Sequence, residues 1–166
     1  MTEVTDEWQR RVDAVWMDAA LDDAARIAAI DELAAELGPR HPVALFERAG
    51  ARDSAGLEAE AEPLYLAALD AGLDPHRRTQ AVIQLASTIR NLGRTDEALA
   101  LLRDEYVATR GGEFADEAAA FYALALVSSG DAVQAASIAL TALAPHLTRY
   151  TRSVAGYAAE LVDGHA

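Results

Sequence analysis

Residues 79–106 read TQAVIQLASTIRNLGRTDEALALLRDEY, and the rest of the chain repeats the pattern of this stretch. On each side of Leu92-Gly93-Arg94, apolar residues recur every three or four positions, which is typical of an amphipathic helix. Glycine permits the left-handed backbone conformation that ends many helices. The stretch therefore predicts two helices that reverse direction at Gly93.

The turn glycine recurs at intervals of 37 residues, at Gly56, Gly93 and Gly130. A small residue follows each glycine by five positions, at Ala61, Ala98 and Ala135. The glycine allows a tight reversal, and the small residue lets the second helix approach the first closely. A fixed period of this length is typical of stacked helical hairpins. Extending the register backwards reaches Ala19 and Ala24, so we expect the first hairpin to be a copy without its glycine.

Nine helices joined by short turns are expected. Five side chains are predicted to cap helix N-termini, namely Thr5, Asp22, Asp74, Thr95 and Asp131. The first helix should bury one face, formed by Trp8, Val12, Val15, Trp16 and Ala19. Because proline disrupts a helix interior, the fourth helix either begins near Glu60 or is kinked at Pro63. We expect one domain over 1–166, with repeats at approximately 5–41, 42–78, 79–115 and 116–147 and a capping helix at 148–163.

The chain has 166 residues, no cysteine and a formal net charge of −13. This charge argues against binding to nucleic acid and to anionic membranes, both of which attract basic surfaces. Without cysteine, neither a disulfide nor a thiolate metal site can form. No apolar run approaches the roughly 20 residues that span a bilayer, and the acidic N-terminal sequence lacks the pattern of a secretory signal. We therefore expect a cytoplasmic protein.

This pattern resembles the tetratricopeptide repeat family. The matching positions are Trp8 and Ala24 in the first copy, Gly56, Ala61, Tyr65 and Ala68 in the second, Leu85, Ala86, Gly93, Ala98 and Leu102 in the third, and Tyr122, Ala123, Leu126, Gly130, Ala135, Ala139 and Ala142 in the fourth. The segments 45–50 and 84–93 are similar to a bacterial subfamily of short tetratricopeptide proteins. The resemblance implies an all-α fold, a right-handed superhelix of about four hairpins with a C-terminal capping helix and no chemistry of its own.

The resemblance also implies a concave groove, lined by the first helix of each hairpin, that binds a peptide or a helix of a partner protein. The fifth predicted helix carries an uncharged polar face opposite its apolar stripe. Its members are Gln80, Gln84, Ser87 and Asn91, with Arg90 beside them. Amide side chains can hydrogen-bond a peptide backbone. Positions one repeat earlier and one repeat later complete the predicted groove, namely Glu47, Asp53 and Ser54, and Phe121, Leu124 and Ser128.

No catalytic residue, cofactor or metal site is predicted. His41 and His76 lie 35 residues apart in matching turns, and we interpret both as solvent-facing. Three acidic residues alternate along one helix, at Glu58, Glu60 and Glu62, so they point in different directions and do not form a carboxylate pair.

Other interpretations stay open beside the binding of a protein or peptide. The polar groove residues could merely satisfy one another, Asp53 with Arg90 and Ser54 with Asn91. The chain could form a homodimer through Phe121 and Leu124, or through the ninth helix. It could serve as a small-molecule sensor, using Glu47, Asp53 and Arg90. The protein's own last helix could also occupy the groove.

Overall fold

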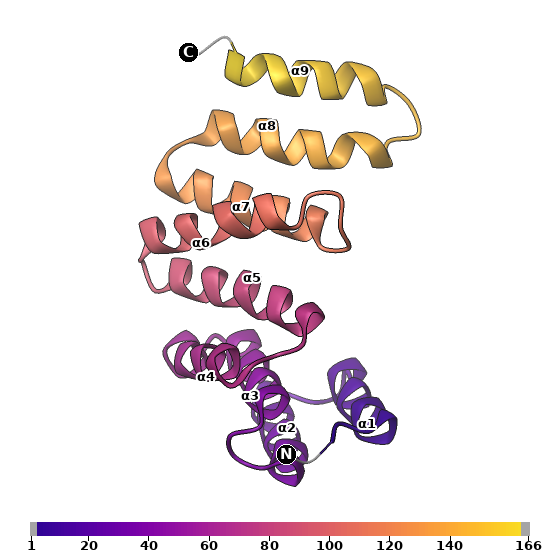
Figure 1. The fold of residues 1–166 in the computed structure, drawn as a ribbon, viewed down its shortest axis with the longest axis vertical. Helices are drawn as coiled ribbons and strands as arrows, with labels where there is room; N and C mark the ends of the chain where they lie inside the picture. Colours follow the sequence, from indigo (N-terminus) through magenta and orange to yellow (C-terminus); the bar gives the residue numbers. More distant parts are fainter. Residues whose placement is uncertain (1–2, 164–166) are drawn as a thin grey trace. The chain divides into compact units, whose positions relative to one another are not determined.

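The computed structural model describes residues 3–163, which form α-helices joined by short turns and contain no strand (Figure 1). In chain order the elements are α1 (Asp6–Met17), α2 (Asp23–Leu37), α3 (Pro42–Ser54), α4 (Glu58–Ala71), α5 (Pro75–Asn91), α6 (Thr95–Ala108), α7 (Ala115–Ser129), α8 (Ala132–Leu143), the 3₁₀ helix η1 (Ala144–His146) and α9 (Thr151–Asp163). The all-α prediction is confirmed. The ninth helix begins three residues later than 148, the predicted start.

The chain divides into two compact units, of which the first runs up to Thr88 and the second begins at Ile89. In the first unit, α1 packs against α2, α2 against α3, and α3 against α4. In the second unit, α6 packs against α7, α7 against α8, and α8 against α9. Consecutive helices are therefore neighbours in each unit, as expected for hairpins with short connections.

The turn after α5 shows why glycine recurs in the chain. Gly93 has a φ of +85°, in the left-handed region that glycine adopts without a steric penalty. Its N–H donates to Arg90 O at 2.9 Å, and the N–H of Arg94 donates to Ile89 O at 3.1 Å. The same two bonds recur 37 residues earlier and later, where Gly56 and Gly130 also have positive φ. These bonds satisfy the last carbonyl groups of α3, α5 and α7, so the predicted repeating turn is confirmed.

The three small residues that follow these turns are buried, as predicted. Ala61, Ala98 and Ala135 have exposed fractions of 0%, 0% and 3%.

The first hairpin follows a different rule. Its predicted counterparts Ala19 and Ala24 are both exposed, and α1 ends at Met17, so the placement of Ala19 on a buried face was wrong. Aspartates shape this connection in place of a glycine. Asp18 Oδ1 accepts the N–H of Ala20 at 2.9 Å, and Asp22 Oδ1 accepts the N–H of Ala25 at 2.8 Å.

Four of the five predicted N-caps are confirmed. The side chains of Thr5, Asp22, Asp74 and Asp131 each accept a backbone N–H two or three residues into the following helix. The fifth was wrong, because Thr95 is already helical and the N-cap residue is Arg94, which makes no side-chain cap bond. The turn at Gly93 passes directly into α6, where Arg94 O accepts the N–H of Ala98 at 3.1 Å.

Two other local expectations also failed. Of the two alternatives for α4, the late start near Glu60 was wrong, because α4 begins at Glu58 and contains Pro63 in its interior. The prediction that His41 faces solvent was also wrong, because His41 is buried. Its Nδ1 accepts the N–H of Val43 at 3.2 Å and so caps α3. His76 is exposed, as expected.

The core of the first unit gathers apolar side chains from its first three helices. Its buried members are Trp8, Val12, Ile30, Leu33, Ala34, Leu37, Val43, Ala44 and Ala51. Two contacts attach α1 to α2, because Trp8 Nε1 donates to Leu33 O at 2.9 Å and Arg11 forms a two-pronged pair with Glu36. None of the helices within residues 3–163 is long and apolar enough to cross a membrane.

Candidate functional site

From Ala81 onward, most side chains of helix α5 are buried. Its buried side chains are Ala81, Val82, Ile83, Leu85, Ala86, Thr88 and Ile89. The accessible side chains from Gln80 to the end of the helix form what we call the α5 strip, defined as Gln80, Gln84, Ser87, Arg90 and Asn91. Asn91 is exposed and the other four are half-buried. The predicted amide face therefore reaches solvent, although four of its five members do so only partly.

Glu47 on α3 is the most enclosed of the predicted groove residues, with an exposed fraction of 7%. Its Oε2 accepts the indole N–H of Trp16 at 2.9 Å, which joins α3 to α1. Burial raises the pKa of this carboxyl group above its ordinary value, and the charge of Asp13 acts in the same direction. The Trp16 hydrogen bond and the charge of Arg77 act against the rise. Little of this carboxylate is left for a partner to touch.

Arg77, in the first turn of α5, connects that helix to α1. Its Nη2 donates to Gln9 Oε1 at 2.7 Å, and its Nη1 lies 2.8 Å from Asp74 Oδ2. Gln9 in turn donates to Asp13 at 2.8 Å. The N-terminal helix is thus held to α3 by Trp16 and to α5 by Gln9, over long separations in sequence.

Asp53, at the end of α3, forms a second polar network with α4 and α5. Thr88 Oγ1 donates to Asp53 Oδ1 at 2.8 Å, and the Tyr65 hydroxyl lies 3.4 Å from Asp53 Oδ2. The same hydroxyl donates to Gln84 Oε1 at 3.0 Å. Burial raises the pKa of Asp53, and the hydrogen bonds that Asp53 receives from Thr88 and Tyr65 oppose the rise. Arg90 donates to its neighbour Asn91 at 3.2 Å.

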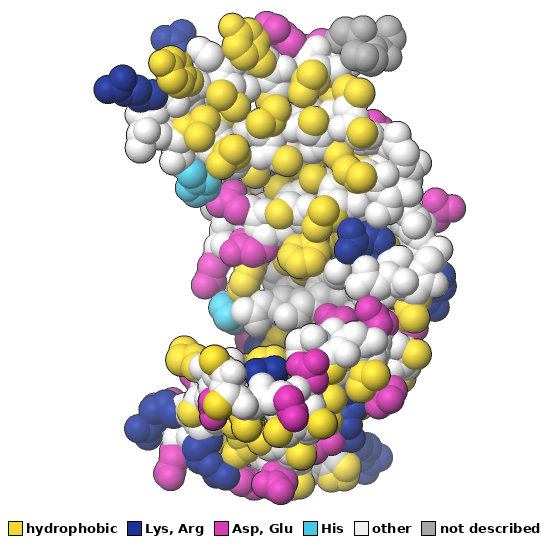
Figure 2. Space-filling model, turned by 180° about the vertical axis from the view of Figure 1, so that it is seen from behind, with side chains coloured by type: hydrophobic (Ala, Val, Ile, Leu, Met, Phe, Trp, Pro, Cys, Tyr) yellow, Lys and Arg dark blue, Asp and Glu magenta, His cyan; other side chains and the backbone are white. Residues whose placement is uncertain are grey.

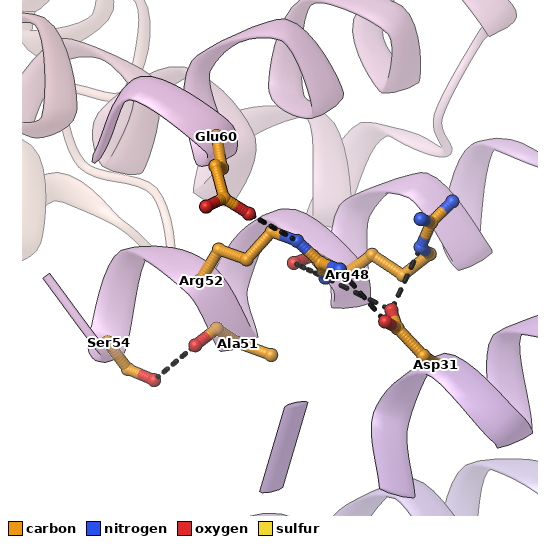
Figure 3. Close-up of polar contacts among 6 residues, drawn as sticks. All are labelled: Asp31, Arg48, Ala51, Arg52, Ser54 and Glu60. Atoms are coloured by element: carbon orange, nitrogen blue, oxygen red, sulfur yellow. Dashed lines mark hydrogen bonds and ion pairs between the residues drawn. The ribbon is translucent and has the colours of Figure 1, made fainter. Parts of the chain in front are cut away.

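A charged cluster lies on α2, α3 and α4 beside Ser54 (Figure 3). Arg52 donates hydrogen bonds to both carboxylate oxygens of Asp31, at 3.0 and 2.8 Å. Arg48 Nε donates to the same carboxylate at 3.0 Å. Arg52 also lies 3.6 Å from Glu60. The hydrogen bond from Arg52 is the main reason why the pKa of Asp31 is lowered. Ser54 is exposed, and its hydroxyl donates to Ala51 O within the same helix.

The second unit contributes the apolar members of the predicted groove, all on α7. Leu124 has an exposed fraction of 47% and Phe121 is half-buried. Ser128 is exposed, and its hydroxyl donates to Leu124 O at 3.1 Å. On the buried side of this helix, the rings of Tyr122 and Tyr106 stack at 5.4 Å. An exposed leucine beside a half-buried aromatic ring is a surface that can receive an apolar side chain.

Sequence reasoning missed three residues that organise the first unit, namely Trp16, Tyr65 and Thr88. It placed Trp16 on an apolar face and used Tyr65 only as a position that matches the repeat family, so it did not foresee the polar contacts of the indole N–H and the phenol. Thr88 is fully buried. A lone hydroxyl residue within the apolar stripe of α5 was the available signal, because a buried hydroxyl needs a hydrogen-bond partner.

The buried carboxylate of Glu47 gives a pH-dependent prediction for Glu47→Gln. Glutamine keeps an oxygen that accepts from Trp16 but carries no charge. A raised pKa in the folded protein means that wild-type stability is lost as the pH rises through that pKa, above the ordinary value of 4.5. The unfolding free energy of Glu47→Gln minus that of wild type should therefore increase as the pH rises above 4.5 toward 7. Urea unfolding curves of both proteins across this range measure the difference.

The matched control is Glu36→Gln. The hydrogen bond from Arg11 lowers the pKa of this exposed carboxylate, so the stability that it contributes is lost as the pH falls below the ordinary value of 4.5. The unfolding free energy of Glu36→Gln should therefore approach that of wild type as the pH falls below 4.5, a change of the opposite sense at lower pH than the response of Glu47→Gln. A difference between Glu47→Gln and wild type that stays constant across the range would contradict the prediction.

Within residues 3–163, no group of three or more His, Asp or Glu side chains is arranged to hold a metal ion. A comparison with curated proteins finds no match. A comparison with protein families finds that the tetratricopeptide repeat model matches residues 42–161, from the first residue of α3 to the last turn of α9. The match covers most of the chain and includes all three glycine turns. The chain therefore belongs to the tetratricopeptide repeat family.

Proposed function

We propose that this protein is a non-catalytic module that binds a peptide or a helix of a partner protein. Tetratricopeptide repeats generally serve as scaffolds for protein–protein interaction, and the family assignment supports this class of function. The observation that carries the proposal is the α5 strip. An ordinary solvated helix face is rich in charged residues, whereas this one offers amides, a hydroxyl and a single guanidinium group.

Each unit carries proposed contact residues of its own. On the first unit, Gln80, Gln84 and Ser87 supply hydrogen-bond donors and acceptors for a peptide backbone. On the second unit, Arg90 and Asn91 continue the α5 strip, and Leu124 on α7 supplies an exposed apolar contact. Glu47 and Asp53 act as supports in this proposal, because both are engaged by neighbouring side chains.

We also infer the setting in which the module works. The net charge of −13 argues against nucleic acid and anionic membranes as partners, and it favours a partner segment that is neutral or basic. A cytoplasmic location and the division into repeats at 42–78, 79–115 and 116–147 belong to the same proposal, with 5–41 as a divergent first repeat and α9 as the capping helix.

Selection from a random peptide library, followed by affinity measurements on the selected peptides, tests the proposed surface. The double variant Arg90→Ala/Asn91→Ala should weaken binding by about tenfold or more, because hydrogen bonds to charged and amide groups contribute about 1–3 kcal/mol each. Arg103→Ala is the control, since it removes one positive charge from an exposed site on α6. Unchanged affinity of the double variant would show that the assigned surface is wrong.

A further inference from the structure

The last helix has two unlike faces. One face, with Val154, Ala158 and Leu161, is turned inward, and Ser137 on α8 donates to Ala158 O at 2.6 Å. The opposite face is exposed. Its members follow helical spacing and are Arg152, Ala155, Gly156, Ala159 and Asp163, with the exposed Ser153 and Glu160 along one edge. A helix that only caps a repeat array carries a polar outer face, whereas the centre of this face consists of alanine and glycine.

The exposed face of α9 has no covering helix in its own unit. Helix α7 packs against both α6 and α8, whereas α9 packs against α8 and η1 only. Within residues 3–163, no other helix of the second unit covers the exposed face of α9.

The flanks of this face are apolar as well. Tyr150 and Tyr157 have exposed fractions of 74% and 66%, and Val162 is 38% exposed. Figure 2 shows hydrophobic side chains gathered over α8 and α9, at the top of the view. Exposed apolar surface of this kind marks interaction sites in soluble proteins.

The charges on this face are complementary to themselves. Arg152 lies at its N-terminal end and Asp163 at its C-terminal end, and neither forms an ion pair within residues 3–163. When two such helices lie antiparallel, one register places Arg152 opposite Asp163 of the other copy and also places Gly156 opposite Ala159 of the other copy. Small residues at the crossing point let helix axes approach to about 8 Å.

We propose that two copies of this chain associate through α9, antiparallel about a two-fold axis. The self-complementary charges and the small residues fit an isologous contact, in which the same patch serves both copies. One helix from each copy buries less than the roughly 1,200 Å² of a standard interface, so we expect a weak dimer with a dissociation constant in the micromolar range. This inference does not depend on the proposed peptide surface.

Sedimentation velocity of the full chain tests the proposal, over protein concentrations from about 1 to about 500 μM, which bracket a micromolar dissociation constant. Wild type should shift from monomer to dimer across this series. Gly156→Leu should stay monomeric, because bulk at the crossing point keeps the two helices apart. A Cβ atom added at Gly156 meets no other atom within 4 Å, so this variant should fold normally. Ser153→Leu places the same bulk on an exposed flank of α9 and should still dimerise.

A charge exchange tests the register itself. Arg152→Asp and Asp163→Arg should each weaken dimerisation by about tenfold, because like charges then face each other across the two-fold axis. The double variant Arg152→Asp/Asp163→Arg restores opposite charges and should recover the wild-type dissociation constant. A wild type that is monomeric at every concentration would overturn the proposal. A dimer that Gly156→Leu leaves unchanged, or a double variant as weak as the single ones, would also overturn it.

Discussion

Replacing Tyr65 with alanine is expected to lower the free energy of unfolding by about 3–5 kcal/mol, the cost of deleting a buried aromatic ring. Tyr65 has an exposed fraction of 0%, and its ring lies 6.3 Å from that of Phe46. The substitution leaves a cavity between α3 and α4, and it removes the hydroxyl that holds Gln84 and neighbours Asp53. Urea unfolding monitored by far-UV circular dichroism measures the loss.

Tyr65→Phe separates the ring from the hydroxyl. It keeps the packing and removes only the hydrogen bonds, so the expected loss is about 1–2 kcal/mol. A Tyr65→Ala protein that is as stable as Tyr65→Phe would mean that the ring contributes little to packing. The phenylalanine variant also releases the side chain of Gln84 within the α5 strip. It should therefore alter peptide affinity while the fold remains intact.

Replacing Trp8 with alanine is expected to destabilise the first unit by a comparable amount, about 3–5 kcal/mol. Trp8 has an exposed fraction of 4% and belongs to the core shared by α1, α2 and α3. Its indole also donates to Leu33 O, which loses that partner in the variant. We expect amide hydrogen exchange in α1 to rise well above wild-type levels, because α1 loses its main anchor.

The control for Trp8 is Trp16→Phe. Trp16 is half-buried, and this substitution keeps an aromatic ring while it removes the hydrogen bond to Glu47. We expect a loss of about 1–3 kcal/mol, since Glu47 keeps its carboxylate but loses a partner. If Trp8→Ala left exchange in α1 unchanged, the packing of α1 against α2 would not be what holds this helix in place.

The turns of this protein were predictable because their chemistry is local. A glycine with positive φ and a small residue five positions later recur in the sequence, and the structure uses both at the three turns after α3, α5 and α7. The caps at Thr5 and Asp22 were equally readable, because each depends on a side chain and an N–H only three residues apart. Thr95 failed because the preceding glycine turn runs straight into α6, a geometry that a cap preference does not reveal.

The polar networks were not predictable in the same way. Thr88 bonds Asp53 across 35 residues, and Trp16 bonds Glu47 across 31. Helical periodicity identifies which face a residue occupies but not which distant side chain meets it. The amide residues of α5 were correctly placed on its accessible side, whereas the engagement of Glu47 and Asp53 became visible only from the structure. The role of the predicted groove residues in partner binding remains a prediction.

The repeated turn has a consequence for how the chain can change length. The two hydrogen bonds that close α3 recur at the ends of α5 and α7, each set 37 residues from the last. A cassette cut from one glycine to the next therefore begins and ends with the same backbone junction. Duplicating or deleting such a cassette joins ends that already match, so the array can grow or shrink by whole hairpins without a newly evolved connection.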